Sequence, residues 1–187
     1  MTVPGKEQTK SQSALHTAFS SRLMHAKLPS IKEHLIFWSI AIFGVAADLW
    51  TKSAVFASLE QDGSVPILNG LLRLVRTENP GAAFGIAMGQ RYLLVAVSAI
   101  ALLIILFLFF FVEIRPTVVH VALGLFSAGI VGNLYDRIFN DGMVRDFIDV
   151  VYWPGKHWPA FNIADAMLCV AVGLMMLSTC FSRERTR

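Results

Sequence analysis

The stretch Tyr92–Val112 contains 21 consecutive residues without a single charged side chain. A helix of that length spans the roughly 30 Å hydrocarbon core of a bilayer. Further apolar runs lie at 34–58, 117–137 and 161–181. Only 16% of the residues are charged, whereas soluble domains carry about 25%. The sequence therefore predicts a mainly α, polytopic membrane protein with four transmembrane helices, at about 34–58, 90–112, 117–137 and 161–181.

The segments between these helices predict a single membrane domain over 34–181 with two parts outside the bilayer. Residues 61–85 hold the short runs VPIL and LLRLVRT between turn signals, which predicts a small β patch. Residues 138–160 form a loop in which Trp153 and Trp158 are placed like interface anchors. Residues 1–33 are expected to be a mobile cytoplasmic extension, and 182–187 a basic cytoplasmic tail.

Positive charges beside the apolar runs predict how the helices are oriented. The N-terminal flank, the short loop containing Arg115 and the C-terminal tail are all basic, and such segments stay in the cytoplasm. Both termini are then cytoplasmic, and the β patch and the 138–160 loop lie on the outer face. The formal net charge of +3 is small and forms no basic stripe, which argues against a nucleic-acid partner.

This topology collects polar residues from distant parts of the chain near the outer face. Asp165 lies about one turn inside the fourth predicted helix, where a carboxylate costs roughly 2–3 kcal/mol and marks a functional site. Breaks at Pro154, Gly155 and Pro159 would let a re-entrant loop bring Asp146 against it. The residues expected to gather there are Asp48, Asn79, Asn133, Asp136, Arg137, Asp146, Asn162 and Asp165.

Two carboxylates within hydrogen-bond reach share a proton, since both cannot ionise at close range. The ionised member takes a proton from water and the protonated member donates to a scissile carbonyl, so the pair favours hydrolysis. No metal or other cofactor is expected, because Asp149 and His157 make only a weak ligand set. A proton or ion pathway remains open. The alternative that each aspartate pairs separately with Arg137 or Arg145 also remains open.

Asp48 and Lys52 have the i, i+4 spacing of a helical ion pair, with the acid first. By that spacing they form either an ion pair at the water interface or part of the site.

Five motifs, in order along roughly His34–Phe181, resemble the lipoprotein signal peptidase family, signal peptidase II. They are DLWTK at 48–52, ENPGAAFG at 78–85, GNLYDR at 132–137, VRDFID at 144–149 and FNIAD at 161–165. The resemblance implies a bacterial membrane aspartic endopeptidase. Such an enzyme removes the signal peptide from diacylglyceryl-modified prolipoproteins by cutting before the lipidated cysteine.

Carried over by motif, the resemblance makes Asp146 and Asp165 the catalytic pair that activates water. The residues expected to bind substrate are Asn79, Asn133, Arg137, Asn162, Asp48 and Lys52. The family also has a periplasmic β-cradle and a short helix near the site, which fit 61–85 and part of 138–160. The implied location is the inner membrane, with prolipoproteins and membrane lipids as partners and a monomer as the expected state.

Two alternatives belong to other classes. A proton-coupled transporter predicts inverted repeats and acids at mid-membrane depth, and the second and third predicted helices show no such acid. A non-catalytic assembly subunit would not need Asp146 and Asp165 together.

Overall fold

The computed structural model describes residues 28–82 and 85–184, with side chains described to residue 180. Its four helices are α2 (Ile31–Ser58), α3 (Arg91–Phe111), α4 (Thr117–Phe139) and α5 (Ile163–Glu184). All four contain a segment long and apolar enough to cross a membrane. The predicted class, a mainly helical membrane protein with four spans, is confirmed.

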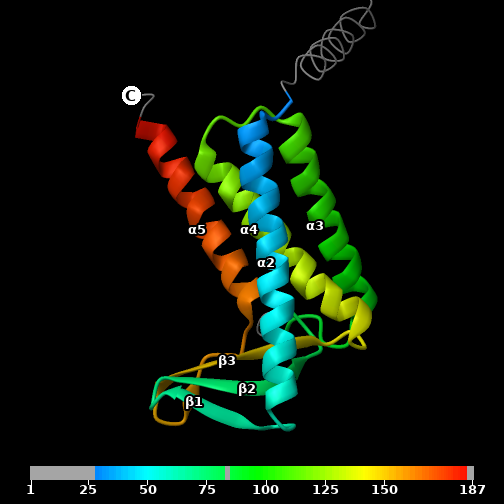
Figure 1. Cartoon of the computed structure of the whole chain (residues 1–187), viewed down its shortest axis with the longest axis vertical. Coiled ribbons are helices and arrows are strands. Elements are labelled where there is room, and N and C mark those ends of the chain that lie inside the picture. The colour runs from blue at the N-terminus through cyan, green and yellow to red at the C-terminus, as the bar shows by residue number, and fades with distance from the viewer. Residues whose placement is uncertain (1–27, 83–84, 185–187) are drawn as a thin grey trace, which may run out of the picture.

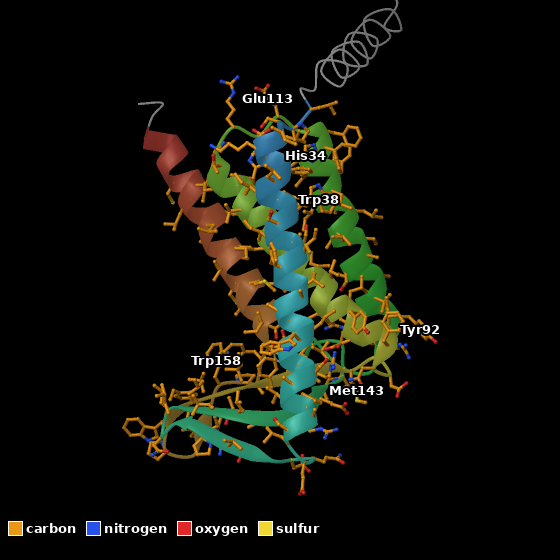
Figure 2. The ribbon with its side chains drawn as sticks, in the orientation of Figure 1. His34, Trp38, Tyr92, Glu113, Met143 and Trp158 are labelled. Carbon is orange, nitrogen blue, oxygen red and sulfur yellow. The ribbon has the colours of Figure 1, made fainter. Side chains whose placement is uncertain are left out.

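Helix α4 lies at the centre of the bundle. In the most apolar 18-residue stretch of α4, half of the residues are buried, compared with 17% in the corresponding stretch of each of the other three helices. Small residues on α4 allow this close packing: a Cβ on Gly124 would meet the backbone of Phe37, and one on Gly129 would meet Leu168. Large apolar side chains project outward along the helices (Figure 2), as expected where lipid replaces water.

The start of α2 is set by a capping box. Ser30 accepts a hydrogen bond from Glu33 N at 3.4 Å, while Glu33 accepts one from Ser30 N at 2.5 Å. Reciprocal caps satisfy free N–H groups, so α2 begins at Ile31, three residues before the predicted position. Residues 1–27 of the predicted extension and 185–187 of the predicted tail lie outside the described residues.

The sheet lies at one end of the bundle. The start of α2, the α3–α4 connection and the end of α5 lie at the other end (Figure 1). The sheet has four antiparallel strands in the order β1-β2-β3-β4. They are β1 (Ser64–Leu68), β2 (Leu72–Asn79), β3 (Val144–Trp153) and β4 (Lys156–His157). Thr77 pairs with Asp146 and Asn79 with Val144. The β2–β3 pairing thus joins the two segments predicted to lie outside the membrane.

The expectation that part of 138–160 forms a short helix is wrong. After α4 ends at Phe139, the described residues of this segment form β3 and β4 instead. VRDFIDVVYW is rich in β-branched and aromatic residues, which favour strands. The backbone of β3 also supplies the hydrogen-bond partners that the second edge of β2 needs. A partner from a distant segment was not visible to local sequence patterns.

Candidate active site

Asp165 stands in the first turn of α5, where a local capping arrangement holds it. Asp165 N donates to Asn162 Oδ1 at 3.0 Å, and Asn162 N donates to Asp165 Oδ2 at 3.3 Å. This reciprocal pattern is that of a capping box, with asparagine as the cap and aspartate three residues on. The FNIAD motif thus starts the helix and aims its aspartate with the same contacts.

Asp146 comes from β3 and is almost completely buried, with a relative exposure of 1%. Its Oδ2 accepts from Asn79 Nδ2 at 3.0 Å, and its Oδ1 accepts from Asn162 Nδ2 at 2.7 Å. Asn162 therefore contacts both aspartates, Asp146 through its side chain and Asp165 through its capping bonds. Asn133 on α4 completes the set, donating through Nδ2 to Asp165 Oδ1 at 2.8 Å.

The pKa of Asp146 is raised from its ordinary value of 3.8 to about 7. Burial is the largest cause, because it disfavours the charged form, and the neighbouring Asp165 adds to it. The amide donors of Asn79 and Asn162 oppose the shift, as does the charge of Lys52. Near neutral pH, Asp146 is therefore able either to hold or to release a proton.

Four charged residues form a buried network behind the two aspartates. Lys52 Nζ lies 2.7 Å from Asp48 Oδ2 and 3.1 Å from Asp136 Oδ2. Asp136 also binds the guanidinium of Arg145, with an Nη2–Oδ1 distance of 2.7 Å. Asp48 Oδ1 accepts from Ala164 N at 2.8 Å. Helix α2 therefore fixes the first turn of α5, which carries Asp165.

A cavity of about 470 Å³ opens beside the aspartates. Asp146 and Asp165 both line it, together with Asn79, Asn133 and Arg137. The remainder of its lining is largely apolar: Gly81, Ala82, Val144, Trp158, Pro159, Ala160, Phe161, Ala166, Leu168 and Cys169. The cavity therefore presents two carboxylates to a space with an apolar wall.

Arg137 is buried at the end of α4, with 8% relative exposure. Its Nη2 donates to Gly81 O at 3.1 Å and its Nη1 to Asn133 O at 3.4 Å. Its Nε is buried without a hydrogen-bond partner in the described part of the chain. Arg137 thus ties the segment after β2 to α4 and keeps one donor unused.

The predicted site residues converge, but at different depths. Asn79, Asn133, Arg137, Asp146 and Asp165 reach the cavity. Asn162 is buried behind the two aspartates, while Asp48 and Lys52 are fully buried in the charge network. None of these three lines the cavity. Their described contacts are with protein groups, and the substrate contact expected of them stays a prediction.

The alternative pairing of the aspartates with arginines is not observed. Within the described residues, no ion pair joins Asp146 or Asp165 to an arginine, and Arg145 binds Asp136 instead. Asp136 was visible in the GNLYDR motif as a neighbour of Asn133, but its partnership with Lys52 was not. The wall formed by Trp158–Phe161 was missed, and its composition gave no signal of it.

Asp149 and His157 form a separate cluster with Arg73 on the sheet. His157 Nδ1 lies 3.1 Å from Asp149 Oδ1, and Arg73 makes a close ion pair with the same carboxylate. None of the three lines the cavity beside Asp146. Over residues 28–82 and 85–184, no three His, Cys, Asp or Glu side chains are grouped for a metal ion.

The fold and the site define a polytopic membrane protein with an aspartate pair beside a cavity at the sheet end of its bundle. Residues 40–181 match the family model described as signal peptidase (SPase) II. The chain belongs to this family, whose members are proteases.

Curated relatives agree over most of the chain. The lipoprotein signal peptidase of Halalkalibacterium halodurans is 36% identical over 143 residues, covering 76% of this chain and 90% of the relative. That of Symbiobacterium thermophilum is 39% identical over 138 residues, covering 74% and 90%.

Among solved structures, one titled as a bacterial membrane enzyme determined by the in meso method at 2.3 Å resolution superposes with a TM-score of 0.76. It is 29% identical and covers 87% of this chain and 96% of its own.

Proposed function

We propose that this protein is an aspartic endopeptidase that removes the signal peptide from diacylglyceryl-modified prolipoproteins, cutting before the lipidated cysteine. One observation carries the proposal: Asn162 contacts both Asp146 and Asp165 beside a cavity that the two carboxylates line. Membership of the signal peptidase II family supports the reaction class. The names of the curated relatives support a lipoprotein substrate.

In the proposed mechanism the two carboxyl groups divide the proton transfers. Asp165 accepts hydrogen bonds from Asn133 and Asn162 on its two oxygens and lies at a helix N-terminus, where negative charge is favoured. It is the base that takes a proton from the attacking water. Asp146, with a pKa of about 7, donates a proton to the scissile carbonyl oxygen. When the tetrahedral intermediate collapses, the C–N bond breaks, Asp165 gives its proton to the leaving amine, and Asp146 takes a proton back from a hydroxyl of the intermediate.

The substrate class follows from the lining of the cavity. Ala166, Leu168 and Cys169 continue the cavity along α5, and Cys169 is exposed on a helix that crosses the membrane. Acyl chains would lie along this face while the peptide enters between Gly81 and the Trp158–Phe161 wall. Such anchoring holds the scissile bond near the carboxylates and so supplies proximity.

The same proposal places the site at the outer face of the bacterial inner membrane, with both termini in the cytoplasm. The basic flanks of the helices support this orientation. A monomer is proposed because the two aspartates and three asparagines come from one chain. The remaining partners are the lipids that surround the four helices.

The proposal is tested by cleavage of a diacylglyceryl-modified prolipoprotein by the purified, reconstituted protein. Asp146→Asn and Asp165→Asn should each lower kcat by about 10²–10⁴-fold, the range attributed to a positioned acid or base. Asp149→Asn is the matched control, because Asp149 is a buried acid of the same strand that binds Arg73 away from the cavity. It should retain cleavage within a few-fold of the native protein.

Retention of near-native cleavage by either Asp146→Asn or Asp165→Asn would remove that residue from the catalytic pair. Addition of a chelator should leave the rate unchanged. Strong inhibition by a chelator would favour a metal-dependent reaction. Equal cleavage of a substrate without the diacylglyceryl group would refute the proposed lipid requirement.

A further inference from the structure

Three asparagine side chains surround the aspartate pair, and each has its carbonyl oxygen held by a donor. Asn79 Oδ1 accepts from Gly81 N, and Asn162 Oδ1 accepts from Asp165 N, both at 3.0 Å. Asn133 Oδ1 accepts from Lys52 Nζ and from Asn162 Nδ2, both at 3.1 Å. An amide with its oxygen held in this way must turn its NH2 group in the opposite direction. In all three cases that NH2 group donates to a carboxylate of the pair.

Asn133 differs from the other two asparagines because both donors to its oxygen, Lys52 and Asn162, are side chains. The backbone N–H groups that hold Asn79 and Asn162 are fixed by the fold, whereas Lys52 extends from α2 to reach α4. An ammonium group has three donors and no acceptor. If the Asn133 amide turned over, its NH2 would face this ammonium. Its oxygen would also face the Asp165 carboxylate, so both contacts would be lost.

The position of Lys52 is itself determined by charge. Its ammonium is fully buried and lies between Asp48 and Asp136, at 2.7 and 3.1 Å. Arg145 binds the second oxygen of Asp136. The network holds two cations and two anions, so it is balanced without help from the aspartate pair. The two carboxylates therefore hold the Lys52 side chain in place beside Asn133.

We propose that Lys52 is a positioning residue for Asp165. By holding Asn133 Oδ1 together with Asn162 Nδ2, it keeps Asn133 Nδ2 directed at Asp165 Oδ1, the carboxylate that acts as the base. This inference rests on the proposed function, in which Asp165 takes the proton from water. Among the described residues, Lys52 does not line the cavity and makes no hydrogen bond to either carboxylate of the pair, so its hydrogen-bonded route to Asp165 runs through Asn133. Its charge also lowers the pKa of Asp146.

Removal of the ammonium should therefore weaken the base in a specific way. Loss of a hydrogen bond to a charged group corresponds to a drop of about 10–100-fold in kcat/KM. The acidic limb of the pH–rate profile should also move to higher pH, because the ionised form of the base has lost a donor. A residue that served only to hold the fold would lower the amount of active protein and leave this limb in place.

The experiment is a double-mutant cycle in a charge-balanced background. Asp48→Asn/Lys52→Met removes one charge of each sign and leaves the Asp136–Arg145 pair intact. It is compared with Asp48→Asn alone, each with and without Asn133→Ala. We expect Lys52→Met to cost about 10–100-fold with Asn133 present and little once Asn133→Ala is in place. The same loss in both backgrounds would overturn the proposal.

Asp136→Asn/Arg145→Met is the matched control, since it removes the other half of the network and leaves Lys52 beside Asn133. We expect this control to lose stability and to keep its acidic limb. A shift of the limb as large as that from Lys52→Met would overturn the proposal. So would an unshifted limb in Asp48→Asn/Lys52→Met. Asp165→Asn distinguishes failure of the role proposed for Lys52 from failure of the proposed function. Normal cleavage by Asp165→Asn would refute the proposed function itself.

A second variant covers the case in which Asp48→Asn/Lys52→Met does not fold, as judged by circular dichroism. Asn133→Asp still accepts from Lys52 but presents an oxygen to Asp165 in place of an NH2 group. It should show the same loss and the same shift while the charge network is complete. A folded Asn133→Asp protein with a native acidic limb would overturn the proposal.

Discussion

Gly132 of α4 lies directly against the carboxylate of Asp48 on α2. A Cβ at this position would collide with Asp48 Oδ2 and would also press on Ala164 Cβ at 3.2 Å. Asp48 in turn accepts the hydrogen bond from Ala164 N, one residue before Asp165. The absence of a side chain at Gly132 therefore allows α2, α4 and α5 to meet at the site.

We predict that Gly132→Ala displaces Asp48 and with it the first turn of α5. Overpacking of this kind costs about 1–3 kcal/mol, and cleavage should fall by more than the loss of folded protein explains. Thermal unfolding in detergent and kcat per folded molecule measure the two effects. Gly173→Ala is the control, because nothing lies within 4 Å of a Cβ there. It should be neutral or slightly stabilising. Equal behaviour of the two variants would contradict the prediction.

The raised pKa of Asp146 predicts a specific dependence of stability on pH. In the native state this group holds its proton up to pH about 7, whereas unfolded it releases it near 3.8. The native state binds more protons between these values, so the free energy of unfolding falls as pH rises through this window. The decrease should be on the order of 2–4 kcal/mol. Asp146→Asn should lose this slope, which unfolding measurements at pH 5 and pH 8 detect. An unchanged slope would assign the titration to another group.

Arg137 is predicted to act through the geometry of its guanidinium group. It donates to the backbone oxygens of Gly81 and Asn133 from two nitrogens, which a lysine cannot reproduce. As a substrate clamp, Arg137 uses the Nε donor at the cavity wall, which has no partner among the described residues. Arg137→Lys removes that donor and should lower cleavage by about tenfold or more, beyond what any loss of folded protein explains. The alternative is a structural role in holding the fold. A variant that melts much earlier, with activity lost in proportion to folded protein, would support that structural role.

The proposed orientation makes a prediction about accessibility. Reporter fusions at Pro116 and after Arg187 should report the cytoplasm, and a fusion at Gly70, in the β1–β2 turn, should report the outside. The physical reason is the cluster of basic residues beside the cytoplasmic helix ends. A cytoplasmic signal from Gly70 would reverse the molecule and place the aspartate pair on the wrong side for a lipidated, exported substrate.

The sequence predicted the helices and the polar residues that line the cavity, because both follow from local sequence patterns. An apolar run long enough to cross the bilayer determines a spanning helix without reference to the rest of the chain. Acids and amides at the ends of such runs mark the site through the cost of placing them there. The capping arrangement of Asn162 and Asp165 was not predicted, although it also follows a local pattern, a cap residue followed three positions later by an acid.

Only the tertiary structure determined which of these residues contact one another. Asn79 and Asp146 are 67 positions apart, and Lys52 and Asn133 are 81 apart, so both contacts depend on strand pairing and helix packing. Local patterns therefore predicted a loop over 138–160 where β3 pairs with β2. They left Asp48 and Lys52 open between an ion pair at the water interface and a part of the site, whereas the fold buries both. The direction of an amide group is set by the donors and acceptors around it. In this protein those groups come from α2, α4, α5 and the sheet, and only the assembled fold brings them together.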